Sequence, residues 1–200
     1  KNITVKQIVF FSNNLYKTKE VTKILEKTDK KILTLNDFPK VNEPDETGNS
    51  FKENAIIKSS FGFNKFGLPC FADDSGICVS ALNYKPGIKS KTFQEENGGY
   101  DKSFKIIINR AKEKNDYNAF FQTSIAFTDK IHSICFNGKI YGKISSKPLG
   151  LNGFHYDPIF IPQGFNKTFA EMSAEEKNKI SHRAIALKKL KKFLYRYSFN

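Results

Sequence analysis

The stretch that most constrains the fold of this chain is Phe-Ala-Asp-Asp-Ser-Gly at residues 71–76. Apolar runs on both sides, at residues 68–72 and 77–82, each predict a buried strand. Because Gly76 can adopt backbone angles closed to other residues, we expect a sharp reversal between the two strands. The adjacent carboxylates of Asp73 and Asp74 repel each other, and a hard divalent cation would relieve that repulsion. The motif fits either an ordinary hairpin turn or a metal site.

Strands and helices alternate early in the chain, and strands dominate later. Apolar runs predict strands at residues 7–11, 31–35, 119–128 and 157–162. Helical spacing and two capping boxes predict helices at residues 16–27, 51–66, 101–114 and from 173 to about 195, the last one broken near residue 181. Asn137-Gly138 predicts a second hairpin. The pattern indicates a single domain over residues 1–200, of the α/β class, with a mixed sheet flanked by helices.

Charge and cysteine content narrow the class of protein. Lys and Arg outnumber Asp and Glu by 33 to 20, a formal net charge of +13, and residues 177–196 contain eight basic and no acidic side chains. This distribution fits a surface that binds anions. It also fits an ordinary solvated surface whose lysine content reflects a general bias in composition. Three cysteines without Cys-x-x-Cys spacing predict buried free thiols, and therefore a reducing, cytoplasmic location. No signal pattern is evident, and no apolar run approaches the ~20 residues of a membrane span.

Two constellations precede the Asp-Asp motif. The first lies between a predicted strand and a predicted helix, where backbone N–H groups and the helix dipole favour anions; it consists of Ser12, Asn13, Asn14, Leu15, Tyr16 and Lys17. An ordinary helix cap followed by a surface lysine is the alternative. The second is Glu46-Thr47-Gly48 followed by Asn54 and Lys58, which share one face of the predicted helix. Its alternative is a solvated polar face.

Two further constellations lie in the last quarter of the chain. Gly153-Phe154-His155-Tyr156-Asp157 combines aromatic rings with a carboxylate, which suits stacking on a base and hydrogen bonding to its edge. Aromatic core residues at the entry to a strand are the alternative. Lys177, His182 and Arg183 can donate hydrogen bonds to oxygen acceptors, although a single histidine is more often structural.

Taken in order, these stretches resemble the inosine triphosphate pyrophosphatase family, also called Ham1-like. The matching segments are IVFFSNNLYKTKEVTKIL, DETGNSFKENAIIKSSF, GLPCFADDSGICVSALNYKPGIKS and GFHYDPIFIPQGFNKTFAEMSAEEKNKISHRAIALKKL. They cover nearly the whole chain. The resemblance implies a long mixed central sheet, two lobes with a nucleotide-binding cleft between them, and a homodimer. It also implies Mg²⁺-dependent hydrolysis of non-standard purine nucleoside triphosphates (ITP, dITP, XTP) to the monophosphate and pyrophosphate, with Mn²⁺ as a possible substitute.

The same resemblance assigns roles to individual residues. Residues 12–17 and Lys58 would hold phosphates, and Ser75 would touch the nucleotide. Glu46 and Asp74 would ligate Mg²⁺, with Asp73 beside them and Asp74 as the base for the attacking water. The base would be held by Phe154, His155, Tyr156, Asp157, Lys177, His182 and Arg183. A metal ligand has a lowered pKa, so one carboxylate cannot fully serve as both ligand and strong base, and the division between Asp73 and Asp74 stays open.

The chain departs from the family pattern at two places. His155 stands where the family often has Gly or Ala, and Thr92 stands where an arginine is common. Two other functions compete: a Maf-like nucleotide pyrophosphatase with another base preference, and a basic nucleic-acid-binding module whose affinity would fall steeply with salt. The order of the GF-YD and SHR motifs argues against the first. The absence of a recognised aromatic–basic pattern argues against the second, so we expect no specific nucleic acid and no membrane among its partners.

Overall fold

A computed structural model describes residues 6–197 of the chain. Its strands are β1 (Gln7–Phe10), β2 (Lys31–Thr34), β3 (Cys70–Val79), β4 (Lys85–Pro86), β5 (Asn118–Thr128), β6 (Ser133–Ile144) and β7 (Phe160–Pro162). Its α-helices are α1 (Leu15–Ile24), α2 (Phe51–Phe66), α3 (Ser90–Glu96), α4 (Tyr100–Lys114), α5 (Ala174–Ile180) and α6 (His182–Arg196). The strands form a mixed sheet in the order β2-β1-β3-β5-β6-β7, with β4 paired to β3. The α/β class predicted from the sequence is confirmed.

The described residues divide into two compact units, which we call unit 1 and unit 2. Unit 1 comprises residues 6–74, 124–137 and 184–197, and unit 2 comprises residues 75–123 and 138–183. The single domain over residues 1–200 and the cleft between two lobes therefore remain predictions. None of the described helices is both long and apolar enough to cross a membrane.

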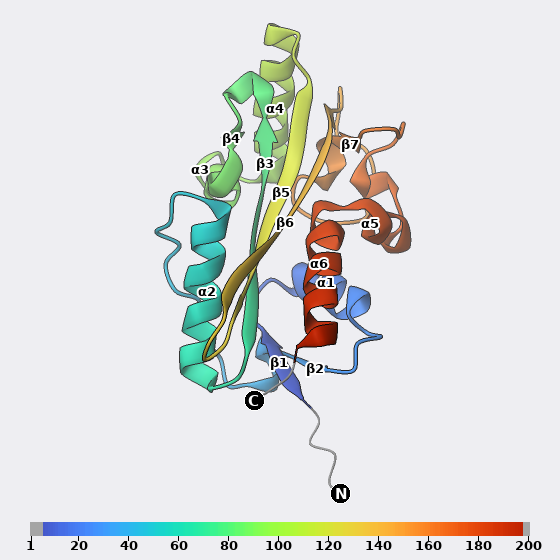
Figure 1. Cartoon of the computed structure of the whole chain (residues 1–200). Coiled ribbons are helices and arrows are strands. Elements are labelled where there is room, and N and C mark those ends of the chain that lie inside the picture. Colours follow the sequence, from blue (N-terminus) through green and yellow to red (C-terminus); the bar gives the residue numbers. More distant parts are fainter. Residues whose placement is uncertain (1–5, 198–200) are drawn as a thin grey trace, which may run out of the picture. The chain divides into compact units, whose positions relative to one another are not determined.

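In unit 1 the alternation of side chains along β1 buries both faces of the sheet. Ile8 and Phe10 pack in one cluster with residues of α1 and α6, whereas Val9 and Phe11 pack in another with residues of β2 and α2. Figure 1 shows α2 on one side of these strands and α1 with α6 on the other. Because a strand that is covered on both faces has apolar residues at nearly every position, the sequence of β1 is a continuous apolar run and predicts a buried strand.

In unit 2 one apolar cluster holds the elements together. It joins the inward-facing residues of β3, β5 and β7 to α4, with Ile77, Phe104, Phe121 and Phe160 among its members. The aromatic rings of Phe121 and Phe160 meet edge to face at 4.7 Å between centroids. This cluster supports the segments that carry the second group of predicted site residues.

Two turns expected from the sequence are absent. β3 runs unbroken through Asp73, Asp74 and Gly76, so the predicted hairpin at this motif is wrong. Gly76 is required for another reason: a Cβ there would lie 2.1 Å from the carbonyl oxygen of Gly87. Asn137-Gly138 likewise lies within β6, and the connection between β5 and β6 is made by residues 129–132 instead. Pairing along a long strand outweighs the local turn preference in both cases.

The remaining differences are smaller. Residues 90–96, for which the sequence predicts no helix, form the short helix α3. The predicted strand at residues 157–162 begins as a 3₁₀ turn and becomes strand only at Phe160. Both capping boxes mark helix starts as predicted, at α2 and α5, and the break near Ser181 separates α5 from α6. Of the three free cysteines, Cys70 and Cys78 are buried and Cys135 is partly exposed.

Candidate active site

Unit 1 contains a cluster of acidic and basic side chains. It lies around Asp73 and Asp74, the last residues of β3 that belong to unit 1. Lys17 from α1 lies with its Nζ 3.3 Å from Oδ1 of Asp73. Lys58 from α2 lies with its Nζ 2.8 Å from Oε1 of Glu46, and it also donates a hydrogen bond to the backbone carbonyl of Asp73. Asp73, Asp74 and Lys58 are buried, while Glu46 is partly open to solvent. Residues 12 to 56 positions apart in sequence thus meet in one polar cluster.

Helix α2 aligns this cluster. The Ser50 hydroxyl accepts from the Glu53 backbone N–H and caps the helix, which fixes the direction of the side chains that follow. One turn later Asn54 donates through Nδ2 to Oδ2 of Asp74 at 3.3 Å, and its Oδ1 accepts from the Gly48 N–H at 2.8 Å. Asn54 therefore ties Asp74 to the loop that carries Glu46. The shared helix face of Asn54 and Lys58 is a site-facing surface and not a solvated one.

The cluster has unusual electrostatics. Burial, together with the neighbouring charges of Glu46 and Asp73, raises the pKa of Asp74 to about 6, although Lys58 and Lys17 act in the opposite direction. Burial also acts to lower the pKa of Lys58, but the charges of Asp73, Glu46 and Asp74 outweigh it and leave that pKa above its ordinary value. Lys58 is therefore a permanent cation among carboxylates, and the surroundings of Asp74 disfavour its negatively charged form.

The fit of these residues to a divalent cation rests on the chemistry of the donors. Glu46, Asp73 and Asp74 supply carboxylate oxygens, which hard cations prefer. Among residues 6–197, no three Asp, Glu, His or Cys side chains converge closely enough to form a complete metal cage. Mg²⁺ bound with a nucleotide commonly uses one or two carboxylates and takes its other ligands from phosphates and water. The donor set fits a cation of that kind and not one held entirely by protein.

The segment before α1 has the predicted strand–turn–helix form. Asn14 is the helix cap, and its Oδ1 accepts from the N–H groups of Tyr16 and Lys17 at 3.0 and 3.1 Å. The Ser12 hydroxyl accepts from the Asn14 N–H, and Asn13 donates to the Val41 carbonyl. These bonds shape the turn, whereas the side chains of Leu15 and Tyr16 point into solvent. Lys17, in the first turn of α1, joins the acidic cluster through its contact with Asp73.

A second group of predicted residues meets in unit 2 around Asp157. Its Oδ2 accepts from the Phe154 N–H at 3.0 Å and from Nζ of Lys177 at 2.6 Å, in a pair that is almost entirely buried. The Lys177 Nζ also lies 4.4 Å from the centroid of the Phe154 ring, a cation–π distance. A Cβ on Gly153 would lie 2.2 Å from Oδ2 of Asp157, so only glycine fits beside this carboxylate. Asp157 thus orients the Phe154 loop and Lys177.

Arg183 also lies close to the Phe154 ring. Its Cζ is 5.7 Å from the ring centroid, and its Nη2 donates to the Ser75 hydroxyl at 3.0 Å. Ser75 in turn donates to Oγ1 of Thr123 at 2.8 Å. Arg183 is 2 % exposed, so its guanidinium is held in a fixed position. A fixed, buried guanidinium recognises planar oxygen acceptors with defined geometry.

Two of the predicted base-binding residues also pack against the core of unit 2. The His182 ring is buried and stacks on Phe121, with centroids 4.7 Å apart and planes inclined by 11°. Tyr156 is buried in the apolar cluster and donates through its hydroxyl to the Ser90 carbonyl. Phe121 and Thr123 were not identified from the sequence. The alternation of side chains along β5 could have indicated that both residues face the same way. It could not have indicated that they contact His182 and Ser75.

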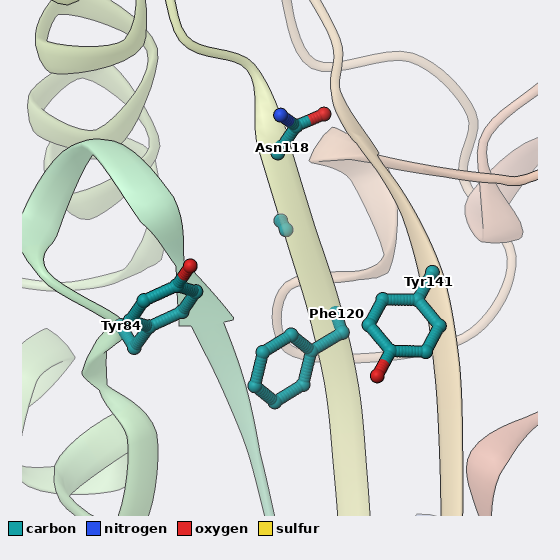
Figure 2. Close-up of a pocket in the computed structure, with 5 residues that line it drawn as sticks. Tyr84, Asn118, Phe120 and Tyr141 are labelled. Carbon is teal, nitrogen blue, oxygen red and sulfur yellow. The ribbon is translucent and has the colours of Figure 1, made fainter.

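Unit 2 also has a surface pocket that none of the predicted site residues lines (Figure 2). It has a volume of about 370 Å³ and is bordered by Tyr84, Asn118, Ala119, Phe120 and Tyr141. Figure 2 shows the rings of Phe120 and Tyr141 on neighbouring strands, with Tyr84 on the opposite side of Phe120. The Nζ of Lys139 lies 4.2 Å from the centroid of Phe120.

Comparisons with known proteins agree with one another. The chain is 38% identical over 191 residues to a dITP/XTP pyrophosphatase of Porphyromonas gingivalis, covering 95% of this chain and 98% of the relative. It is 39% identical over 191 residues to a dITP/XTP pyrophosphatase of Leptospira interrogans, covering 94% and 97%.

Solved structures show the same fold. A HAM1 protein from Coxiella burnetii superposes with a TM-score of 0.87 at 34% identity, over 96% of this chain and all of that one. The Ham1 protein of Staphylococcus aureus superposes with a TM-score of 0.83 at 35% identity, over 95% and 98%. Because the model of the Ham1 family matches residues 8–193, nearly the whole sequence, this chain belongs to the Ham1 family.

Proposed function

We propose that this protein hydrolyses non-standard purine nucleoside triphosphates, among them dITP, XTP and ITP, to the monophosphate and pyrophosphate, and so removes them from the nucleotide pool. The observation that carries the proposal is the cluster in unit 1, where Lys17 and Lys58 accompany three carboxylates. Phosphoryl transfer depends chiefly on charge neutralisation and on positioning of the reacting groups. A cluster with fixed cations and carboxylates supplies both.

The proposed roles in unit 1 follow from the contacts of each residue. Lys17, Lys58 and the N-terminal turn of α1 bind the triphosphate. Glu46 and Asp74 hold Mg²⁺, or Mn²⁺ in its place, which when bound neutralises charge on the phosphates. Asp74 is also the proposed acceptor of the proton of the attacking water. Its pKa of about 6 is that of the metal-free protein, and a bound cation would lower it. Asp73, paired with Lys17, keeps that lysine in position.

The proposed roles in unit 2 concern the base. Phe154 stacks on the purine, and Arg183 and His182 donate hydrogen bonds to its oxygens. Ser75 contacts the nucleotide and is the residue next to Asp74 in β3. Asp157 and Lys177 hold the Phe154 loop through their buried ion pair. We also propose a homodimer and a cytoplasmic location, on the basis of the family alone.

The proposal predicts a substrate profile and a metal requirement. Pyrophosphate release should be fast with dITP, ITP and XTP, slow with ATP and GTP, and absent in every case when EDTA is added. The metal is needed because triphosphate charge must be neutralised before water can attack. The measurement is steady-state kcat/KM for each nucleotide with Mg²⁺, with Mn²⁺ and with EDTA. Activity that persists in EDTA, or that is equal for ATP and ITP, would refute the corresponding part of the proposal.

The preference for 6-oxo bases is predicted to depend on Arg183. Arg183→Met keeps much of the buried volume but removes all hydrogen-bond donors, so kcat/KM for ITP should fall by roughly tenfold or more while that for ATP changes little. An adenine 6-amino group is itself a donor and gains nothing from the guanidinium. Phe154→Leu is the matched comparison, because loss of stacking should lower both rates by similar factors. If Arg183→Met leaves the ITP-to-ATP ratio intact, base selection resides elsewhere.

A further inference from the structure

His155 has a backbone conformation that is uncommon for residues other than glycine. Its φ angle is +54°, in the left-handed region that favours glycine, and to a lesser degree asparagine, aspartate and histidine. Gly153, two residues earlier, also has a positive φ, of +68°. A histidine at such a position is disfavoured unless its surroundings hold it there. Ring contacts of the His155 side chain hold the backbone in this conformation.

The His155 ring lies flat on the ring of Tyr100. The centroids are 5.0 Å apart and the planes differ by 10°, which is a stacked pair. Tyr100 is the first residue of α4, and its ring meets Tyr156 edge to face at 5.2 Å and Phe104 at 6.0 Å. Tyr156 and Phe104 are both buried in the apolar cluster of unit 2. The His155 ring therefore stacks on a Tyr100 ring whose position is fixed by its contacts with the core of unit 2.

His155 also contacts the ring of Phe154. The two rings are nearly perpendicular, at 79°, with centroids 4.9 Å apart. Phe154 is further restrained by its N–H bond to Asp157 and by Nζ of Lys177 over its ring. The left-handed backbone at residue 155 directs the two consecutive rings in different directions, so the stack on Tyr100 fixes where Phe154 points.

We propose that His155 is a positioning residue, whose stack on Tyr100 holds the loop at residues 153–157 in the conformation that presents the Phe154 ring to a purine base. This inference rests on the proposed function, in which Phe154 receives the base. His155 acts through Phe154 and does not itself select among bases. Its loss therefore weakens binding of every nucleotide substrate by a similar factor and leaves the chemical step unchanged.

The test compares His155→Asn with His155→Phe. Asparagine tolerates the left-handed backbone but has no ring to stack on Tyr100. Phenylalanine keeps an aromatic ring but is less compatible with the left-handed backbone. His155→Asn should raise KM for ITP by about five- to tenfold, the effect of one stacked aromatic pair, with kcat within about twofold of the parent. His155→Phe should restore KM to within about threefold. Tyr100→Leu should reproduce His155→Asn, and the double variant should be no worse than either single one.

Amide hydrogen exchange without nucleotide separates this inference from the proposed function. Residues 153–157 should exchange faster in His155→Asn than in the parent, and at the parental rate in His155→Phe. Faster exchange in a protein that hydrolyses none of the nucleotides would support the positioning role and refute the proposed function. Unchanged exchange, an unchanged KM in His155→Asn, or additive effects of Tyr100→Leu and His155→Asn would each overturn the inference.

Discussion

Asp74→Asn is expected to lower kcat by ~10³-fold or more and, in the metal-free protein, to increase stability. The loss of activity follows because asparagine can neither accept the proton of the attacking water nor contribute negative charge to a bound cation. The gain in stability follows from the pKa of Asp74, which folding raises from 3.8 to about 6. An acid with a raised pKa destabilises the folded state once pH exceeds the unfolded value, and the full cost is present above the folded value.

At pH 7.5 that cost is at most about 3 kcal/mol, so Asp74→Asn should raise the melting temperature by several degrees. The difference between variant and parent should shrink as pH falls from about 6 to about 4, where Asp74 becomes protonated in the parent as well. Mg²⁺ with nucleotide should stabilise the parent more than the variant. The measurement is thermal unfolding across pH, alongside pyrophosphate release.

Asp73→Asn is the matched control for this prediction. Asp73 is fully buried and pairs with Lys17, whose side chain is itself largely buried. Removing the carboxylate leaves the lysine without its 3.3 Å partner, so this variant should be less stable than the parent at pH 7.5. Two adjacent aspartates of one strand should thus have opposite effects on stability. If Asp74→Asn destabilises the protein as Asp73→Asn does, the account of charge crowding at Asp74 is wrong.

Lys58→Met is expected to destabilise the protein by about 3 kcal/mol at neutral pH and to abolish most activity. The side chain keeps its volume but loses the cation that faces Glu46 and the Asp73 carbonyl. The carboxylates then lack a neighbouring positive charge, and the pKa of Asp74, which the charge of Lys58 acts to lower, rises further. Because protonation removes that penalty, the difference in stability should be largest above about pH 7 and should shrink in mild acid.

The control for Lys58→Met is Lys65→Met, an exposed lysine in the last turn of the same helix. It should change stability by less than about 0.5 kcal/mol and leave turnover intact. Mg²⁺ should restore part of the lost stability of Lys58→Met, because a divalent cation can occupy the space among the carboxylates. A Lys58→Met protein as stable as the Lys65→Met control, at every pH, would contradict the role given to Lys58.

The parts of the fold that the sequence predicted are those set by local chemistry. Ser50 and Ser173 cap α2 and α5 in the predicted places, and the apolar run of β1 marks a strand buried on both faces. The two errors have one cause. Gly76 and Asn137-Gly138 are turn signals in isolation, but each lies within a long strand whose pairing partners come from elsewhere in the chain. The turn preference of a short segment contains no information about strands that pair with it from elsewhere in the chain.

The same distinction applies to the site. The residue types and their order indicated phosphates, a metal and a base, but not which side chains meet. The pairing of Lys17 with Asp73 joins residues 56 positions apart, and the tie from Asn54 to Asp74 spans 20. His155 illustrates the limit most clearly. From sequence it is only a departure from a motif, whereas its stack on Tyr100 and its left-handed backbone are properties of the folded unit.

The central claim is that water cleaves the bond between the α- and β-phosphates of a non-standard purine triphosphate. The most direct measurement is ³¹P NMR of the products formed from dITP with Mg²⁺ and the purified protein. The account predicts dIMP and pyrophosphate in equal amounts, formed without dIDP as an intermediate. Accumulation of dIDP and inorganic phosphate would instead place cleavage at the β–γ bond and contradict the claim.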